Sequence, residues 1–474
     1  MVGCVYIMGC PSGSVVMSQD NAGQVNRRTY LTIAGSSGIA GLAGCVGFGG
    51  DGGNGGDSGG SDGGSGDGGS AGDGTTAGDT GPDTVVFGQP GALTGSFDFL
   101  QPGVSQAADA AVRHINEAGG PLGADLELVR RDTAVDPQEA RSVTTQLVEN
   151  DDAAAIVGLF SSEINPLWNF LQDLQVPIVT PWPGSTFLDT RGGDKSTPDD
   201  LGDDEWVWRT VVGDTVHTGG SAVYALEEGY ETLGVINGNT EGERSYVEGF
   251  LSVYEENGGS VAEQVEVELG SSSYQAALSR LFDAEFDAFL VSMPQESAIT
   301  ALSDWSDGGY GRQPILSDTL AQQEVIDQVG SDLHGAWVAQ PGRSGPSYDT
   351  FEGIYTEEGD AAINGWTPPS WDAVQVTALA IERAGETSPE AIQQNLGPVS
   401  RGEGTPVATF AEGKEALANG EEITYQGAAT PVEFTQHGNV FGSVSINTAQ
   451  DGTFTQTTQV SAEDVRAYVA EGDY

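Results

Sequence analysis

Two runs of alternating strand-like and helix-like segments dominate this sequence, over residues 84–180 and 232–316. Short apolar segments, typical of buried strands, are separated by longer ones whose apolar residues recur at helical spacing. The first run predicts strands at 84–88, 126–130, 154–158 and 176–180, and helices at 102–118, at 137–150 and beginning at 161. The second predicts strands at 232–236, 261–269, 288–291 and 314–316, and helices at 244–257, 273–284 and 296–307. The alternation predicts an α/β fold of two similar lobes, each a parallel sheet flanked by helices.

Ligands of such sheets bind beyond the carboxyl ends of the strands. When two lobes face each other, the loops at those ends line a shared cleft. The sequence places loops there at 92–95, 161–162 and 181–186 in the first run, and at 239–241, 293–295 and 318–319 in the second. We therefore select as candidate ligand-binding residues Thr94, Ser161, Ser162, Trp182, Gly184, Ser185, Thr240, Gln295 and Asp318.

Several stretches resemble the branched-chain amino-acid (Leu/Ile/Val-type) substrate-binding proteins of ABC transporters, which have the type 1 periplasmic-binding fold. They are GALTG (91–95), HINEAGGPLGADLELVRRDTAVDPQEA (114–140), AIVGLFSS (155–162), VPIVTP (176–181) and YQGAATPVEFTQHGNV (425–440). The resemblance spans roughly residues 84–460 and implies three crossings between the lobes, near 210–214, 335–341 and 440–443. It implies a first lobe of 84–212 plus 338–440 and a second of 213–337 plus 441–474.

The resemblance also implies ligand contacts. The family's carboxylate-binding serine falls on Ser162, at a helix N-terminus that favours an anion. Its acidic residue, which pairs the ligand's ammonium group, falls on Asp318. Two family tyrosines are absent, because 240–242 and 293–295 read TEG and MPQ. The amino-acid ligand is therefore less supported than the fold, since relatives bind amides, urea, aromatic acids or short peptides.

Each candidate also has a plainer interpretation. Asp318 is equally an ordinary surface carboxylate in so acidic a chain, and Ser162 a simple helix N-cap. Trp182, which departs from the family's pattern, either packs in the lobe or narrows the cleft. Glu241 is expected to face solvent.

The N-terminal residues have the order of an export signal. Arg27 and Arg28 precede a short apolar run of small residues, as in a twin-arginine signal. Residues 42–45 read LAGC and resemble a lipobox, in which Cys45 would carry the lipid anchor. Met17 is the expected start, residues 1–45 the signal region, and 46–83, rich in Gly, Ser and Asp, a disordered tether. We expect a protein held at the outer face of the cell membrane through its anchor alone.

Composition narrows the function. A formal net charge of −53 argues against binding to nucleic acid or to anionic membranes. No credible catalytic motif, metal site or cofactor motif occurs, and the four histidines (His114, His217, His334 and His437) are scattered. We expect no enzyme, no cofactor and no metal, but a binding protein that passes a small solute (an amino acid, an amide or a small carboxylate) to the permease and ATPase subunits of an ABC importer. A sensor that presents its closed form to a membrane receptor is the alternative.

The charge also predicts a halophilic protein, since lysine occurs only at Lys195 and Lys414. In molar salt the Debye length is about 3 Å, so self-repulsion among carboxylates is screened. We expect the chain to unfold cooperatively only when about molar salt is present, as followed by circular dichroism against salt concentration. A cooperative transition of full amplitude in dilute buffer would contradict this prediction.

Overall fold

A computed structural model describes residues 83–95, 97–192, 206–343 and 345–469. These residues all fall within one compact unit, Thr76–Tyr474. The predicted export signal at Arg27 and Arg28, the predicted anchor Cys45 and nearly all of the predicted tether lie outside the described residues. Within the described ranges, no helix is both long and apolar enough to cross a membrane.

The first lobe is built on a five-stranded parallel sheet, in the order β2-β1-β3-β4-β5. Most of its strands are buried, as in a parallel sheet covered on both faces. The edge strand Asp125–Asp132 is only partly buried. The strands are β1 (Thr84–Gly91), β2 (Asp125–Asp132), β3 (Ala155–Ile156), β4 (Ile178–Thr180) and β5 (Val207–Arg209), and the helices between them are α1 (Gln101–Glu117), α2 (Pro137–Glu149) and α3 (Ser161–Asp173). The predicted alternation of strands and helices in this run is therefore present.

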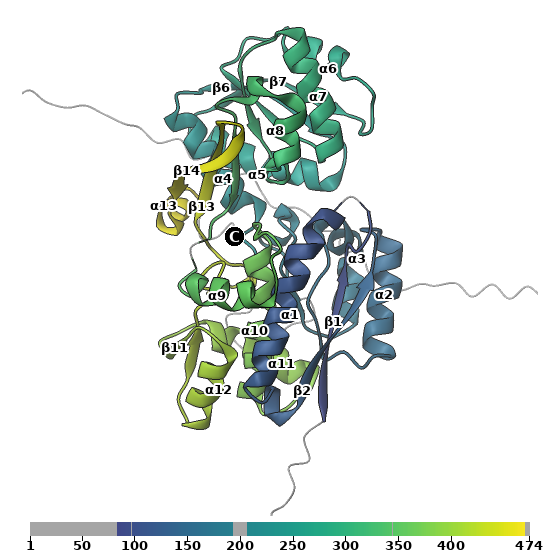
Figure 1. Cartoon of the computed structure of the whole chain (residues 1–474), viewed down its shortest axis with the longest axis vertical. Coiled ribbons are helices and arrows are strands. Elements are labelled where there is room, and N and C mark those ends of the chain that lie inside the picture. Colours follow the sequence, from purple (N-terminus) through teal and green to yellow (C-terminus); the bar gives the residue numbers. More distant parts are fainter. Residues whose placement is uncertain (1–82, 96, 193–205, 344, 470–474) are drawn as a thin grey trace, which may run out of the picture. The chain divides into compact units, whose positions relative to one another are not determined.

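A later part of the chain completes this lobe. Helix α10 (Thr367–Ala384) packs along α1 and is buried over most of its length (Figure 1). The face of α1 that carries Val104, Ala108 and Ile115 is buried. The remaining elements here are α9 (Tyr348–Glu358), α11 (Pro389–Ser400), β11 (Thr405–Val407), α12 (Phe410–Ala418) and β12 (Ile423–Tyr425).

The second lobe has a seven-stranded mixed sheet, in the order β14-β13-β10-β9-β8-β6-β7. Only β13 runs antiparallel to its neighbours, β10 and β14. The strands are β6 (Thr232–Gly238), β7 (Ser260–Val267), β8 (Ala288–Ser292), β9 (Gln313–Leu316), β10 (Trp337–Pro341), β13 (Val444–Gln450) and β14 (Thr453–Val460). The helices are α4 (Asp214–Glu227), α5 (Glu241–Glu256), α6 (Gln275–Leu281), α7 (Gln295–Gly308), α8 (Gln323–Val329) and α13 (Ala462–Tyr468).

One predicted boundary needs correction. The division at residues 337/338 falls inside β10, which pairs with β9 and β13 in the sheet of the second lobe. An apolar strand with partners on both sides stays with its sheet, so the chain leaves the second lobe after Pro341. The other predicted boundaries stay predictions.

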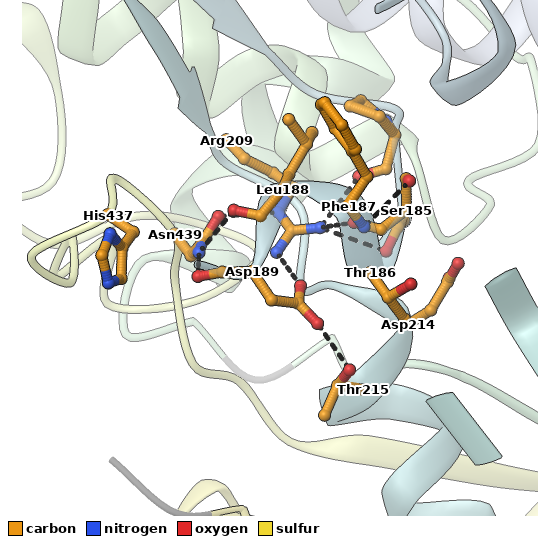
Figure 2. A network of polar contacts seen from close by, with 12 residues as sticks. Ser185, Thr186, Phe187, Leu188, Asp189, Arg209, Asp214, Thr215, His437 and Asn439 are labelled. Atoms are coloured by element: carbon orange, nitrogen blue, oxygen red, sulfur yellow. Dashed lines mark hydrogen bonds and ion pairs between the residues drawn. The ribbon is translucent and has the colours of Figure 1, made fainter. Parts of the chain in front are cut away.

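A buried arginine connects the first crossing with the loop that follows β4 (Figure 2). Arg209, only 1% exposed, donates to the Asp189 carboxylate at 2.7 Å and to the carbonyl oxygens of Gly184 and Ser185. Its Nε donates to Asn439 at 3.1 Å, on the segment that returns to the second lobe. The charge is thus balanced and hydrogen-bonded, as a buried ion must be.

We expect Arg209→Met to lower the free energy of unfolding by about 3–5 kcal/mol, because it leaves Asp189 as a buried carboxylate without its counter-ion. Denaturant unfolding of the full chain in molar salt measures this change. The matched control is Arg280→Met, which breaks the exposed pair of Arg280 with Glu263 and should cost at most about 1 kcal/mol. Equal effects of the two variants would contradict the role of Arg209.

Candidate functional site

A cavity of about 350 Å³ opens where loops of the two lobes meet. Its lining comes from segments that follow the carboxyl ends of strands in both sheets, including Trp182 and Gly184 after β4 and Asp318 and Thr319 after β9. Its size lies in the range of small-molecule sites. This is the position that the strand–helix alternation predicts for a ligand site.

The structure brings most of the predicted site residues together. The cavity is lined by Ser161, Ser162, Trp182, Gly184, Thr240 and Asp318. Thr94, Ser185 and Gln295 are not part of its lining. Contact of any of these residues with a ligand stays a prediction.

The three residues outside the lining have partners that explain their positions. The amide and hydroxyl of Thr94 both donate to the carboxylate of Asp132 at the end of β2. Ser185 is fully buried and accepts a hydrogen bond from the amide of Phe187. Gln295 donates to Glu324 at 2.8 Å. Proximity to a strand end therefore does not by itself direct a side chain into the cavity.

Helix α3 begins at the cavity. Ser161 and Ser162 are its first two residues, and Phe160 is its N-cap, so the interpretation of Ser162 as the N-cap is wrong. The carboxylate of Glu163 accepts from the amide of Phe160, and burial raises the pKa of Glu163 to about 7. First-turn amides of a helix have no acceptors within the helix. The lining at Ser161 and Ser162 therefore suits an anionic or carbonyl group of a ligand.

Aromatic side chains of the first lobe line a second part of the cavity. They are Phe97, Phe160, Trp182 and Trp366. Phe160 stacks on Phe97 with ring centroids 5.4 Å apart and on Trp182 at 4.9 Å. The indole of Trp182 donates to the hydroxyl of Ser370 at 3.0 Å, so this residue both packs in the lobe and faces the cavity.

Polar groups of the second lobe line a third part. His217, on α4, has its Nδ1 3.8 Å from a carboxylate oxygen of Asp214 and its Nε2 3.6 Å from one of Asp318. Both distances exceed a hydrogen bond, and neither of the two buried ring nitrogens has a hydrogen-bond partner. Tyr246 lies edge-on to the imidazole, with ring centroids 5.6 Å apart.

Burial sets the protonation of this polar group. It raises the pKa of Asp214 to about 7 and that of Asp318 to about 6, and it lowers the pKa of His217. The hydroxyl of Ser245 donates to Asp214 and opposes part of that rise. Near neutral pH the imidazole is uncharged, and both carboxyls lie close to their titration range. A ligand cation would favour the ionised form of either carboxyl.

Sequence reasoning missed several lining residues. Asp214 and His217 have a detectable signal, because they are three residues apart on the helix that follows the first crossing. Phe160 immediately precedes the selected Ser161. Trp366 has no local signal, because it reaches the cavity from a distant part of the chain.

Glu241 differs from its predicted place in solvent. It lies at the start of α5 in the second lobe, and its carboxylate accepts hydrogen bonds from Asn165 on α3 and from Ser185. Ser245, one turn further along α5, accepts from the amide of Thr186 at 2.9 Å. These contacts join the two lobes beside the cavity.

The fold and the site define a class of protein. The model of the family named periplasmic binding protein matches residues 84–443, and the chain belongs to this family. Its fold is that of the type 1 members, which are solute-binding proteins and not enzymes.

Individual relatives are similar over most of their length. The leucine-, isoleucine-, valine-, threonine- and alanine-binding protein of Pseudomonas aeruginosa is 25% identical over 66% of this chain and 82% of its own. The chemotactic signal transduction system substrate-binding protein BasB of Halobacterium salinarum is 23% identical over 72% of this chain and 80% of its own. Among solved structures, the leucine-binding protein LivK of Thermotoga maritima has a TM-score of 0.65 at 19% identity, over 80% of this chain and 99% of that one.

We expect Glu241→Ala to weaken ligand affinity by tenfold or more, since hydrogen bonds to a charged acceptor contribute about 1.5–3 kcal/mol and these exist only with the lobes together. Isothermal titration calorimetry with a ligand of the chain measures the change. Glu256→Ala, at the exposed far end of the same helix, is the control and should leave affinity unchanged. Indistinguishable affinities of the two variants would contradict a role for Glu241 in holding the lobes.

Proposed function

We propose that this chain is the extracytoplasmic solute-binding component of an ABC importer and that it binds an amino acid or a related small polar solute in the cavity. The observation that carries the proposal is the pairing within one cavity of the α3 N-terminus, from the first lobe, with Asp318, from the second. A zwitterion fits this pair, because its carboxylate suits the helix end and its ammonium suits a carboxylate in a poorly solvated place.

The proposed mechanism is capture by closure. Ser162 and the neighbouring amides take the carboxylate or carbonyl, and Asp318 takes the ammonium or amide donor. Because the two groups belong to different lobes, a bridging ligand stabilises the closed form, and hinge closure around ligands is general among periplasmic binding proteins. The permease then recognises the closed pair of lobes. The Pseudomonas aeruginosa relative, which is named as an amino-acid-binding protein, supports this ligand class.

The location is part of the proposal. Arg27 and Arg28 would direct export, and lipid attached to Cys45 would hold the protein at the outer face of the membrane of a halophilic cell. Support comes from the order of these signals in the sequence and from the excess of acidic residues.

Sensing is the second candidate function. The Halobacterium salinarum relative, named as part of a chemotactic system, favours it. Reconstitution separates the two candidates: a transport component, once loaded with ligand, stimulates ATP hydrolysis by its permease complex, whereas a sensor binds a transducer.

The testing experiment is thermal unfolding of the full chain in molar salt with a panel of amino acids, amides, urea and small carboxylates. A ligand that binds only the folded state raises the midpoint. We expect a rise with at least one member that carries an amine or amide donor. No rise with any member would count against the proposal.

The pH dependence of binding tests Asp318. Because burial raises the pKa of Asp318 to about 6, its carboxyl in the empty site is mostly protonated below that pH. A bound ammonium favours the ionised form. Affinity for an ammonium ligand should therefore rise between pH 5 and pH 7 and level off above. In Asp318→Asn affinity should fall by tenfold or more, as about 1.5–3 kcal/mol for a hydrogen bond to a charged group implies, with a flatter pH profile. An unchanged affinity would defeat the bridging mechanism.

A further inference from the structure

Besides the N-terminus of α3, the cavity has two chemically different parts of its lining, one from each lobe. The first lobe supplies the four aromatic side chains, and the second supplies Asp214, His217, Tyr246 and Asp318. A ligand that contacts both needs an apolar body and a polar head. The chemistry of the two parts of the lining indicates what kind of apolar body and what kind of polar head group the ligand has.

Contacts within the first lobe hold the aromatic lining in place. Trp182 is 3% exposed, its indole N–H is bound by Ser370, and its ring lies over Gly91, where an added Cβ would stand 3.0 Å from the ring. Phe160 is held between the rings of Trp182 and Phe97. Rings fixed in this way lose little conformational entropy when a ligand packs on them.

The polar lining has an unused acceptor. With its proton on Nδ1, the nitrogen nearer to Asp214, the neutral His217 presents Nε2 as an acceptor beside Asp318. Both ring nitrogens of His217 are buried without a hydrogen-bond partner, and such atoms are costly to leave unsatisfied. A ligand ammonium between Nε2 and Asp318 would bind both acceptors at once.

We propose that the cavity selects a small ligand that carries both an aromatic ring and an alkyl ammonium group, such as an aromatic amino acid. The ring packs on the aromatic lining, which consists of Phe97, Phe160, Trp182 and Trp366. The ammonium group is bound by His217 and Asp318. This inference rests on the proposed function and names the ligand class of that same site. It departs from a branched aliphatic ligand, for which four aromatic side chains offer apolar area without a directional contact.

Two matched pairs of probes test the ring and the head separately. L-Phenylalanine and L-cyclohexylalanine share the head group and differ in the ring, which is aromatic in the first and saturated in the second. Contacts between aromatic rings add about 0.5–1.5 kcal/mol, so phenylalanine should bind about 2- to 12-fold more tightly. A lining that is merely apolar would prefer cyclohexylalanine, whose saturated ring is larger and more hydrophobic.

Phenethylamine and 3-phenylpropanoate share the ring and carry opposite charges, and the amine should bind at least tenfold more tightly.

Variants attribute the selectivity to named residues. In Phe97→Leu and in Trp182→Leu the affinity ratio of phenylalanine to cyclohexylalanine should fall towards one, measured by calorimetry on the full chain in molar salt. The control is Trp168→Leu, because Trp168 is a buried tryptophan of the same lobe outside the cavity lining, and it should leave the ratio unchanged. A ratio of affinities is insensitive to a loss of folded protein, so a destabilised variant still gives an answer.

The outcomes separate this inference from the proposed function. Binding of leucine or of an amide, with cyclohexylalanine equal to or better than phenylalanine, overturns the aromatic preference and leaves the solute-binding proposal standing. Equal binding of 3-phenylpropanoate and phenethylamine overturns the role of His217 and Asp318. If neither these probes nor any member of the wider panel binds, both proposals fail.

Discussion

The ion pair and hydrogen bonds of the buried Arg209 guanidinium are the interactions on which the cavity's geometry depends. A charge in this position must be balanced and hydrogen-bonded, because its desolvation is otherwise prohibitive. Arg209 meets that requirement with Asp189, with Asn439 and with the carbonyl oxygens of the loop after β4. Asp189 in turn accepts from Thr215 on α4 of the second lobe. The same requirement thus fixes the loop carrying Trp182 and Gly184 and ties it to two of the chain's crossings.

Electrostatics at the cavity follow from burial more than from the overall charge of the chain. The surface carboxylates are solvated, but Asp214 and Asp318 are withdrawn from water beside a neutral imidazole, and their pKa values rise accordingly. The second lobe thus presents carboxyl groups that a cationic ligand can ionise when it arrives. The protonated fraction of each carboxyl lowers the cost of burying it in the empty site, and a bound cation favours the ionised form of both.

The sequence predicted those parts of the structure that depend on local periodicity. The strands and helices of both runs lie within a few residues of their expected places, because each is encoded by its own apolar spacing. The loops after β3, β4 and β9 reached the cavity because parallel strands deliver their carboxyl ends to one edge. The assignment of β10 to the second lobe was missed because one of its two partner strands, β13, comes more than 100 residues later. Glu241, Phe97 and Trp366 depend on how distant segments pack, for which one sequence has no local signal.

The order in which the chain builds the first lobe has a consequence for its synthesis. The sheet is complete by Arg209, yet α10, which covers the buried stripe of α1, begins only at Thr367, after most of the second lobe has been made. Contacts so distant in sequence form slowly and expose apolar surface while they are awaited. A chain emerging from the ribosome therefore carries one open apolar face across more than 150 residues of further elongation. Chaperones acting on this protein would be needed chiefly during that interval. A truncation before α10 would leave an incomplete first lobe that exposes apolar surface and aggregates, rather than a stable fragment.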